Sequence, residues 1–162
     1  MSYYINIYNT RKHRDRNIQL VKESTYNYEG VGDGNFTLAD SPEKAAKIFE
    51  YAFDASKLPQ EYFWLMTLDG ARRVNGLFEV TRGTLLSSLV HPREVFSRGL
   101  LANAASIIIA HNHPSGMLDI SEQDREVTRR IRNAGEILGI RLDDHIIIAS
   151  DGDDSYNFVS AF

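Results

Sequence analysis

The sequence predicts an α/β fold in a chain of 162 residues, which is the size of one domain. Two short apolar segments, 62–68 and 105–110, have the length of buried strands. Helix signals stand before and after them, because Ser41-Pro42 places an N-cap ahead of a proline and residues 121–138 show helical periodicity. Strand and helix segments that alternate along a chain with 43% hydrophobic residues favour a single α/β core.

The composition limits the kinds of catalytic and binding site that the chain can have. The chain has no cysteine, which excludes disulfides, thiolate catalysis and cysteine-ligated metals, so any metal must bind His, Asp or Glu. The first twenty residues are too polar for a secretory signal, and the longest aliphatic runs are too short to span a bilayer. We therefore expect a cytoplasmic protein. The net charge of −4 argues against a dedicated nucleic-acid binder.

Residues 1–40 predict an N-terminal β extension to a main domain at 41–162. Tyrosines and aliphatic residues suggest short strands near residues 3–7, 18–21 and 26–28. A basic turn at 11–16 separates the first two strands, and a glycine-rich segment at 30–34 follows the last.

The remaining elements follow in order from caps, turns and periodicity. A helix should start after Ser41 and run to about residue 55, and Asp69-Gly70 should join two strands of a central hairpin around a buried Trp64. The last long helix should end at Gly139 and bury one stripe of side chains. The predicted strands are 62–68, 74–81, 105–110, 142–149 and 156–159, the later helices are 92–103 and 121–138, and the stripe is Val127, Ile131, Ala134 and Leu138.

A metal site is predicted just beyond the strand at 105–110. Residues i and i+2 of an extended chain face the same side, so His111 and His113 can present both imidazoles to one point. Asp124 falls in the first turn of the next helix and can complete three ligands of the N,N,O type. Such a set suits zinc and leaves a fourth position open for water.

Two alternatives stay open from the residues alone. Ser121 and Asp124 also have the spacing of a plain helix-capping pair. A hydrolytic zinc site needs a general base, and both Glu61 and Glu79 are candidates in the central hairpin.

The segment from Glu61 to Ile148 resembles the RadC-like branch of the JAMM, or MPN-plus, zinc metalloenzymes. Four blocks in the expected order carry the resemblance. They are Glu61-Tyr62-Phe63 leading to Leu68-Asp69; Arg82-Gly83-Thr84-Leu85 with residues 90–96; His111 to Gly116 with Ser121 and Asp124; and Asp144-His145-Ile146-Ile147. The resemblance implies an MPN/JAMM, cytidine-deaminase-like fold, in which helices flank a curved mixed sheet.

The same resemblance implies a role for each matching residue. It implies one zinc ion per chain, held by His111, His113 and Asp124, with Glu61 as general acid/base and Ser121 as oxyanion donor. Zinc-bound water would then attack an amide or isopeptide carbonyl of a peptide or protein. Asn112 departs from the deubiquitinating members, which have Ser or Thr between the two histidines, so ubiquitin-like substrates are not inferred.

Two other functions compete with the hydrolase. One is a DNA-repair-associated accessory protein with structural zinc, which would bind nucleic acid through the basic turn and a stripe of Arg125, Arg129 and Arg132. The other is a non-catalytic protein-interaction module, against which the complete ligand set counts. His91 and His145 fit a structural role as well as a functional one.

Overall fold

The computed structural model describes residues 3–12, 18–28, 38–83, 90–152 and 154–162. The strands are β1 (Tyr3–Lys12), β2 (Ile18–Tyr28), β3 (Tyr62–Leu68), β4 (Val74–Arg82), β5 (Ser106–Asn112), β6 (Arg141–Gly152) and β7 (Ser155–Ser160). The helices are α1 (Pro42–Phe53), α3 (Pro92–Leu101) and α4 (Glu122–Leu138), with a 3-10 turn, η1, at Ala55–Lys57.

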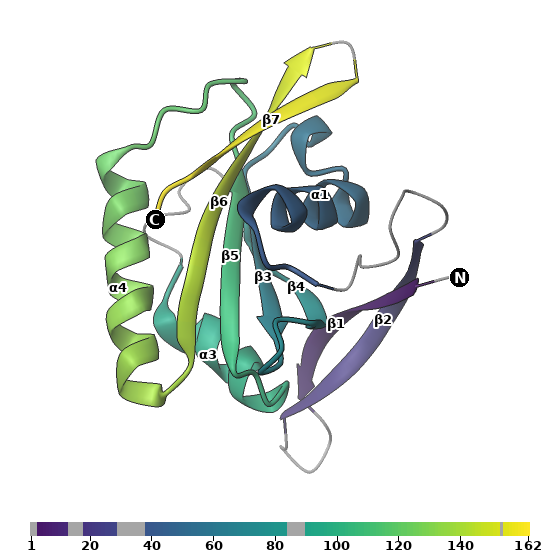
Figure 1. Cartoon of the computed structure of the whole chain (residues 1–162), viewed down its shortest axis with the longest axis vertical. Helices are drawn as coiled ribbons and strands as arrows, with labels where there is room; N and C mark the ends of the chain where they lie inside the picture. Colours follow the sequence, from purple (N-terminus) through teal and green to yellow (C-terminus); the bar gives the residue numbers. More distant parts are fainter. Residues whose placement is uncertain (1–2, 13–17, 29–37, 84–89, 153) are drawn as a thin grey trace.

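Within the described ranges, seven strands form one mixed sheet in the order β2-β1-β4-β3-β5-β6-β7. The β1–β4 and β5–β6 pairs are parallel, and the other neighbours are antiparallel. Helices cover both faces of the sheet, with α1 on one side and α4 on the other (Figure 1). The predicted α/β class with a mixed sheet flanked by helices is confirmed.

The N-terminal strands are longer than predicted and belong to the main sheet. The first two strands pair along their whole length, and Ile7 pairs with Leu77 of β4. Most of the predicted basic turn, 13–16, and the glycine-rich segment 30–34 lie outside the described residues. The division of the chain at residue 40 stays a prediction.

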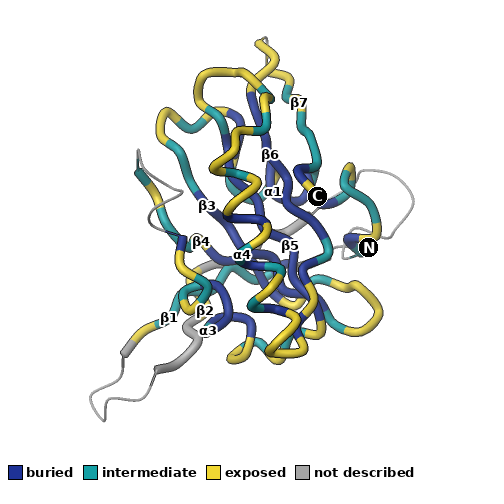
Figure 2. Tube along the Cα trace, turned by 90° about the vertical axis from the view of Figure 1, so that its left-hand side faces the viewer, coloured by how far each residue is buried: buried dark blue, intermediate teal, exposed yellow. Residues whose placement is uncertain are grey.

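The central strands β3 and β5 are buried along almost their whole length (Figure 2). Successive side chains of a strand point to opposite faces of the sheet, so both faces are covered. On one face, Trp64 and Met66 of β3 pack in the cluster that includes α1, as the sequence predicted for Trp64. On the other face, Phe63 and Leu65 pack in the cluster that includes α3 and α4. A strand buried on both faces reads as an unbroken apolar run, which explains why β3 has no polar–apolar alternation.

The α4 helix begins and ends as predicted but buries a different last residue. Ser121 is its N-cap and Gly139, at φ 70°, is its C-cap. Val127 and Ile131 are buried, whereas the prediction for Leu138 is wrong, because this side chain is 45% exposed. Gly135 takes the buried place in the last turn, where its backbone meets the chain that returns at Ile140.

None of the described helices has the length and apolar character needed to cross a bilayer.

The β5 strand runs two residues further than predicted. His111 pairs with Phe63 on one side and with Ile147 on the other, and Asn112 pairs with Ile148. The strand was predicted to end at Ala110, and the extra pairing on both sides is the reason that it continues. The first histidine therefore lies inside the sheet, where its backbone is held on both sides.

We predict that Gly135→Ala destabilises the protein even though alanine favours helices. A Cβ atom at this position would clash with the carbonyl oxygen of Ile140 and lie 3.2 Å from the ring of Phe96. Such overpacking costs about 1–3 kcal/mol. Denaturant unfolding should show this loss of free energy of unfolding.

Gly99→Ala is the matched control. It lies in α3, and its added Cβ would have no neighbour closer than 3.8 Å. We expect this variant to gain up to about 1 kcal/mol from helix propensity. Equal effects of the two substitutions would contradict the packing argument.

Candidate metal centre

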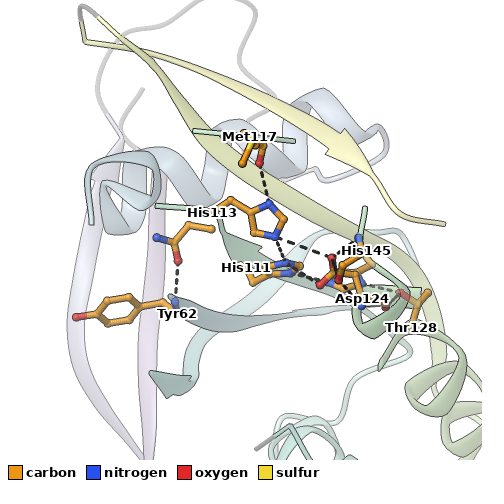
Figure 3. A network of polar contacts seen from close by, with 9 residues as sticks. Tyr62, His111, His113, Met117, Asp124, Thr128 and His145 are labelled. Carbon is orange, nitrogen blue, oxygen red and sulfur yellow. Dashed lines mark hydrogen bonds and ion pairs between the residues drawn. The ribbon is translucent and has the colours of Figure 1, made fainter. Parts of the chain in front are cut away.

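Three potential ligands converge where β5 meets the start of α4 (Figure 3). His111 is in β5, His113 follows that strand, and Asp124 lies in the first turn of the helix. The two histidine Nε2 atoms are 3.0 Å apart, and His111 Nε2 is 3.1 Å from Asp124 Oδ1. His113 Nε2 lies 3.9 Å from Asp124 Oδ2. The structure thus brings together the three residues predicted to bind a metal.

The tautomer of His113 is set by a backbone carbonyl. Its Nδ1 lies 2.8 Å from the carbonyl oxygen of Met117. A carbonyl only accepts hydrogen bonds, so Nδ1 carries the hydrogen in the neutral ring. The lone pair of Nε2 is then directed toward Asp124 and His111.

A chain of buried hydrogen bonds sets the tautomer of His111 in the same way. Thr128 donates its hydroxyl to the carbonyl of Asp124 over 2.7 Å, so its oxygen accepts from Nδ1 of His145, also at 2.7 Å. Complete burial holds the pKa of His145 well below its usual value, so this ring is neutral. Its Nε2 therefore accepts from Nδ1 of His111 over 2.9 Å. This leaves Nε2 of His111 to share a hydrogen with Asp124 or, once that hydrogen is lost, to offer its lone pair to a metal ion.

The ligand atoms of the three residues therefore point at one another. Two imidazole nitrogens and a carboxylate meet, with all three ligand atoms within 4.8 Å. When neither Nε2 atom carries a hydrogen, these groups repel one another, whereas one divalent cation between them satisfies all three. Ligands of a tetrahedral ion with bonds of about 2.0–2.1 Å lie about 3.3 Å apart, close to the two shortest separations here. The donor set therefore fits a metal ion.

Asp124 serves the helix and the site at once. Its Oδ2 accepts hydrogen bonds from the backbone nitrogen and the hydroxyl of Ser121, while its Oδ1 faces His111. Burial raises the pKa of Asp124, but the interactions with His111 and Ser121 outweigh burial, and the pKa lies well below its usual value. The capping pair and the ligand, which the sequence left as alternatives, are therefore compatible.

Ser121 lies beside the ligands, but its hydroxyl already has partners. It donates to Asp124 Oδ2 over 2.6 Å and accepts from the backbone nitrogen of Asp124 over 3.1 Å. To donate to an oxyanion, the hydroxyl would have to exchange the first of these bonds. Its role in catalysis stays a prediction.

The two candidate glutamates lie on different cavities. Glu61 and His113 both line a cavity of about 490 Å³, together with Pro114 and Met117. Glu79 is exposed on β4, lies 3.7 Å from Arg82 and lines a separate cavity beside β1. Glu61, and not Glu79, therefore shares a cavity with one of the ligands.

The other candidate residues from the sequence analysis bind partners away from the ligand cluster. His91 is exposed at the N-cap of α3, where its Nδ1 accepts a long bond of 3.5 Å from the backbone nitrogen of Arg93. Arg129 is paired with Glu126, and the guanidinium of Arg132 lies 4.1 Å from the ring centroid of Phe162.

Sequence reasoning missed two residues behind the ligands. The signal for Thr128 is its spacing, because it follows Asp124 by four residues and so lies on the same face of α4. His145 was noted without an assigned role, and its place inside the aliphatic run of β6 was the available signal.

We predict that Thr128→Val weakens divalent-metal binding. The variant keeps the shape of the side chain but removes the hydroxyl that holds His145 and, through it, His111. Loss of such an outer partner typically costs about 10- to 100-fold in metal affinity. Titration with Zn²⁺ or Co²⁺ in a calorimeter would measure the change.

Thr67→Val is the control, because Thr67 is equally buried but bonds the carbonyl of Gly76. Its metal affinity should equal that of the wild type. Unchanged affinity in Thr128→Val would show that the hydroxyl does not orient the ligands.

Comparison with known proteins agrees with this geometry. Residues 39–160 match the family described as RadC-like JAB domain. A UPF0758 protein of Geobacter sulfurreducens is 46% identical over 122 residues, which cover 75% of this chain and 51% of that protein. A UPF0758 protein of Pelobacter propionicus is 43% identical over 80% of this chain and 54% of its own length. The chain spans about half the length of these relatives. With its sheet, its ligand cluster and this match, the chain belongs to the RadC-like JAB-domain family.

Proposed function

We propose that the chain is a zinc-dependent hydrolase of the metallopeptidase type, acting on an amide or isopeptide bond. The observation that carries the proposal is the convergence of two imidazole nitrogens and the Asp124 carboxylate on one point. Two nitrogen ligands and one oxygen ligand are a set that catalytic zinc sites use, because it leaves a coordination position open.

His111, His113 and Asp124 would hold the ion. A bound zinc ion supplies Lewis-acid chemistry, which polarises a carbonyl group and makes water more acidic. Glu61 takes the proton from the attacking water and returns it to the amide nitrogen as the carbon–nitrogen bond breaks. Ser121 donates its hydroxyl to the carbonyl oxygen while that oxygen carries negative charge.

The charges around the cavity favour a peptide as the substrate. Among the described residues that line it, the acidic side chains are Glu61 and Asp119, and no lysine or arginine is present. A phosphate backbone would be repelled by such a lining. A neutral amide with apolar neighbours fits it better, since Met117 and two prolines also line the cavity.

The metal requirement can be tested on the purified protein. We expect about one zinc ion per chain by elemental analysis. His113→Ala and Asp124→Ala should each lose it, because each removes one of only three protein ligands. His91→Ala is the control and should keep it. A native protein that contains no zinc and takes up none on reconstitution would refute the hydrolase.

The base can be tested with the two glutamates. In a screen of peptides and isopeptide-linked lysine peptides, Glu61→Gln should lower kcat by about 10²- to 10⁴-fold while zinc content is unchanged. Glu79→Gln is the matched control and should retain full activity. A Glu61→Gln variant as active as the wild type would exclude this residue as the base.

A further inference from the structure

Asn112 stands between the two histidines on the opposite face of the strand. Successive residues of a strand point to opposite sides, so the side chains of His111 and Asn112 leave β5 in opposite directions. Asn112 is buried, with 1% of its surface exposed, and is not part of the ligand cluster. A buried amide must use its donors and its acceptor within the protein, which raises the question of what it binds.

The amide of Asn112 binds the backbone on both sides of Glu61. Its Oδ1 accepts from the backbone nitrogen of Tyr62 over 2.7 Å, the bond marked at Tyr62 in Figure 3. Its Nδ2 donates to the carbonyl of Gln60 over 2.9 Å and to that of Leu58 over 3.4 Å. The carbonyl of Glu61 itself accepts from the nitrogen of Gly83 over 2.9 Å. Backbone groups of three consecutive residues, 60–62, are therefore fixed.

These bonds begin where the backbone ladder stops. The last pair between β3 and β5 is Phe63 with His111. Beyond it, the side chain of Asn112 attaches the segment before β3 to β5 in place of backbone pairing. Continued by two residues, the antiparallel register would set Glu61 opposite His113, and both residues line the same cavity.

We propose that Asn112 is a positioning residue that fixes Glu61 relative to the metal ligands. This inference rests on the proposed function, because it assigns Asn112 to the placement of the general base. The amide suits the task because it offers one acceptor oxygen and two donor hydrogens on one planar group. Aspartate would lose both donors, and serine or threonine would offer only one.

The first test measures where Glu61 lies, without reference to activity. The protein is loaded with Co²⁺ or with Zn²⁺, and the two forms are compared by NMR at the ¹³C-labelled carboxyl carbon of Glu61. A paramagnetic Co²⁺ ion shifts nuclei that are held close to it. We expect a clear shift at Glu61 in the wild type and its loss in Asn112→Ala, while the shift at the amide of Thr128 is retained.

Ser106→Ala is the matched control for a buried polar group in the same strand. Its hydroxyl donates to Asp143 over 2.6 Å at the far end of β5. Ser106→Ala should leave the paramagnetic shift at Glu61 unchanged. If this variant also loses the shift, the cause is a general loosening of β5 and not the loss of the Asn112 amide.

The second test separates positioning from stability. Asn112→Ala should lower kcat by about 10- to 100-fold with unchanged KM and metal content, as displacement of a catalytic group does. In a Glu61→Gln background, it should cause no further loss, because its effect passes through Glu61. Additive losses in the double variant would overturn the proposal.

The outcomes distinguish this inference from the function on which it rests. No Co²⁺ shift at Glu61 in the wild type would overturn the role of Glu61 and the positioning role with it. A shift that persists in Asn112→Ala would overturn only the positioning role. If Asn112→Ala does not fold, Asn112→Ser replaces it, and the scalar coupling across the hydrogen bond from Tyr62 nitrogen to Asn112 Cγ tests the contact in the wild type. Absence of that coupling would refute it.

Discussion

The pairing of β5 with both β3 and β6 is the constraint on which the site depends. It holds the backbone of His111 and Asn112 from two sides, so the first ligand has almost no freedom to move. The same pairing places His145 of β6 beside His111. His145 pairs with Ile109, which lies two residues before His111 on the same face of β5. A ligand carried on a central strand is positioned more firmly than one on a loop, which is what a metal site with only three protein ligands needs.

Burial of these polar side chains is tolerated because each has a partner. An unpaired buried donor or acceptor costs about 1–3 kcal/mol, so a histidine or asparagine inside an aliphatic sheet would be expensive without one. Here His145 bonds His111 and Thr128, and Asn112 bonds the segment before β3. Within this network, the Nε2 atoms of His111 and His113 are left facing each other and Asp124. The network thus directs its remaining acceptors to the point where a cation would bind.

Periodicity and capping predicted the order and type of most helices and strands. Contacts between distant parts of the chain explain where those predictions differ from the structure. The cap at Ser121 and the helix end at Gly139 depend on local chemistry, so the sequence was sufficient to predict them. The exposure of Leu138 and the end of β5 depend on which segments of the chain pack alongside, and that is not a local property. The spacing of His111 and His113 is local, so it indicated a metal site. The bonds from His145 to Thr128 and from Asn112 to the residues on either side of Glu61 join distant parts of the chain, so only the structure shows them.

The start of α4 couples the ligand set to the folding of the helix. Asp124 can offer Oδ1 to the site only while Ser121 holds Oδ2, and that pair is the capping box that begins the helix. A cap of this type is worth about 1 kcal/mol, so loss of Asp124 removes helix stability as well as a ligand. His113 depends on the same segment, since its Nδ1 donates to Met117 in the loop that leads to Ser121. A cation that joins the two would therefore tie this loop and the first turn of α4 to β5, and metal binding should order the connection between sheet and helix.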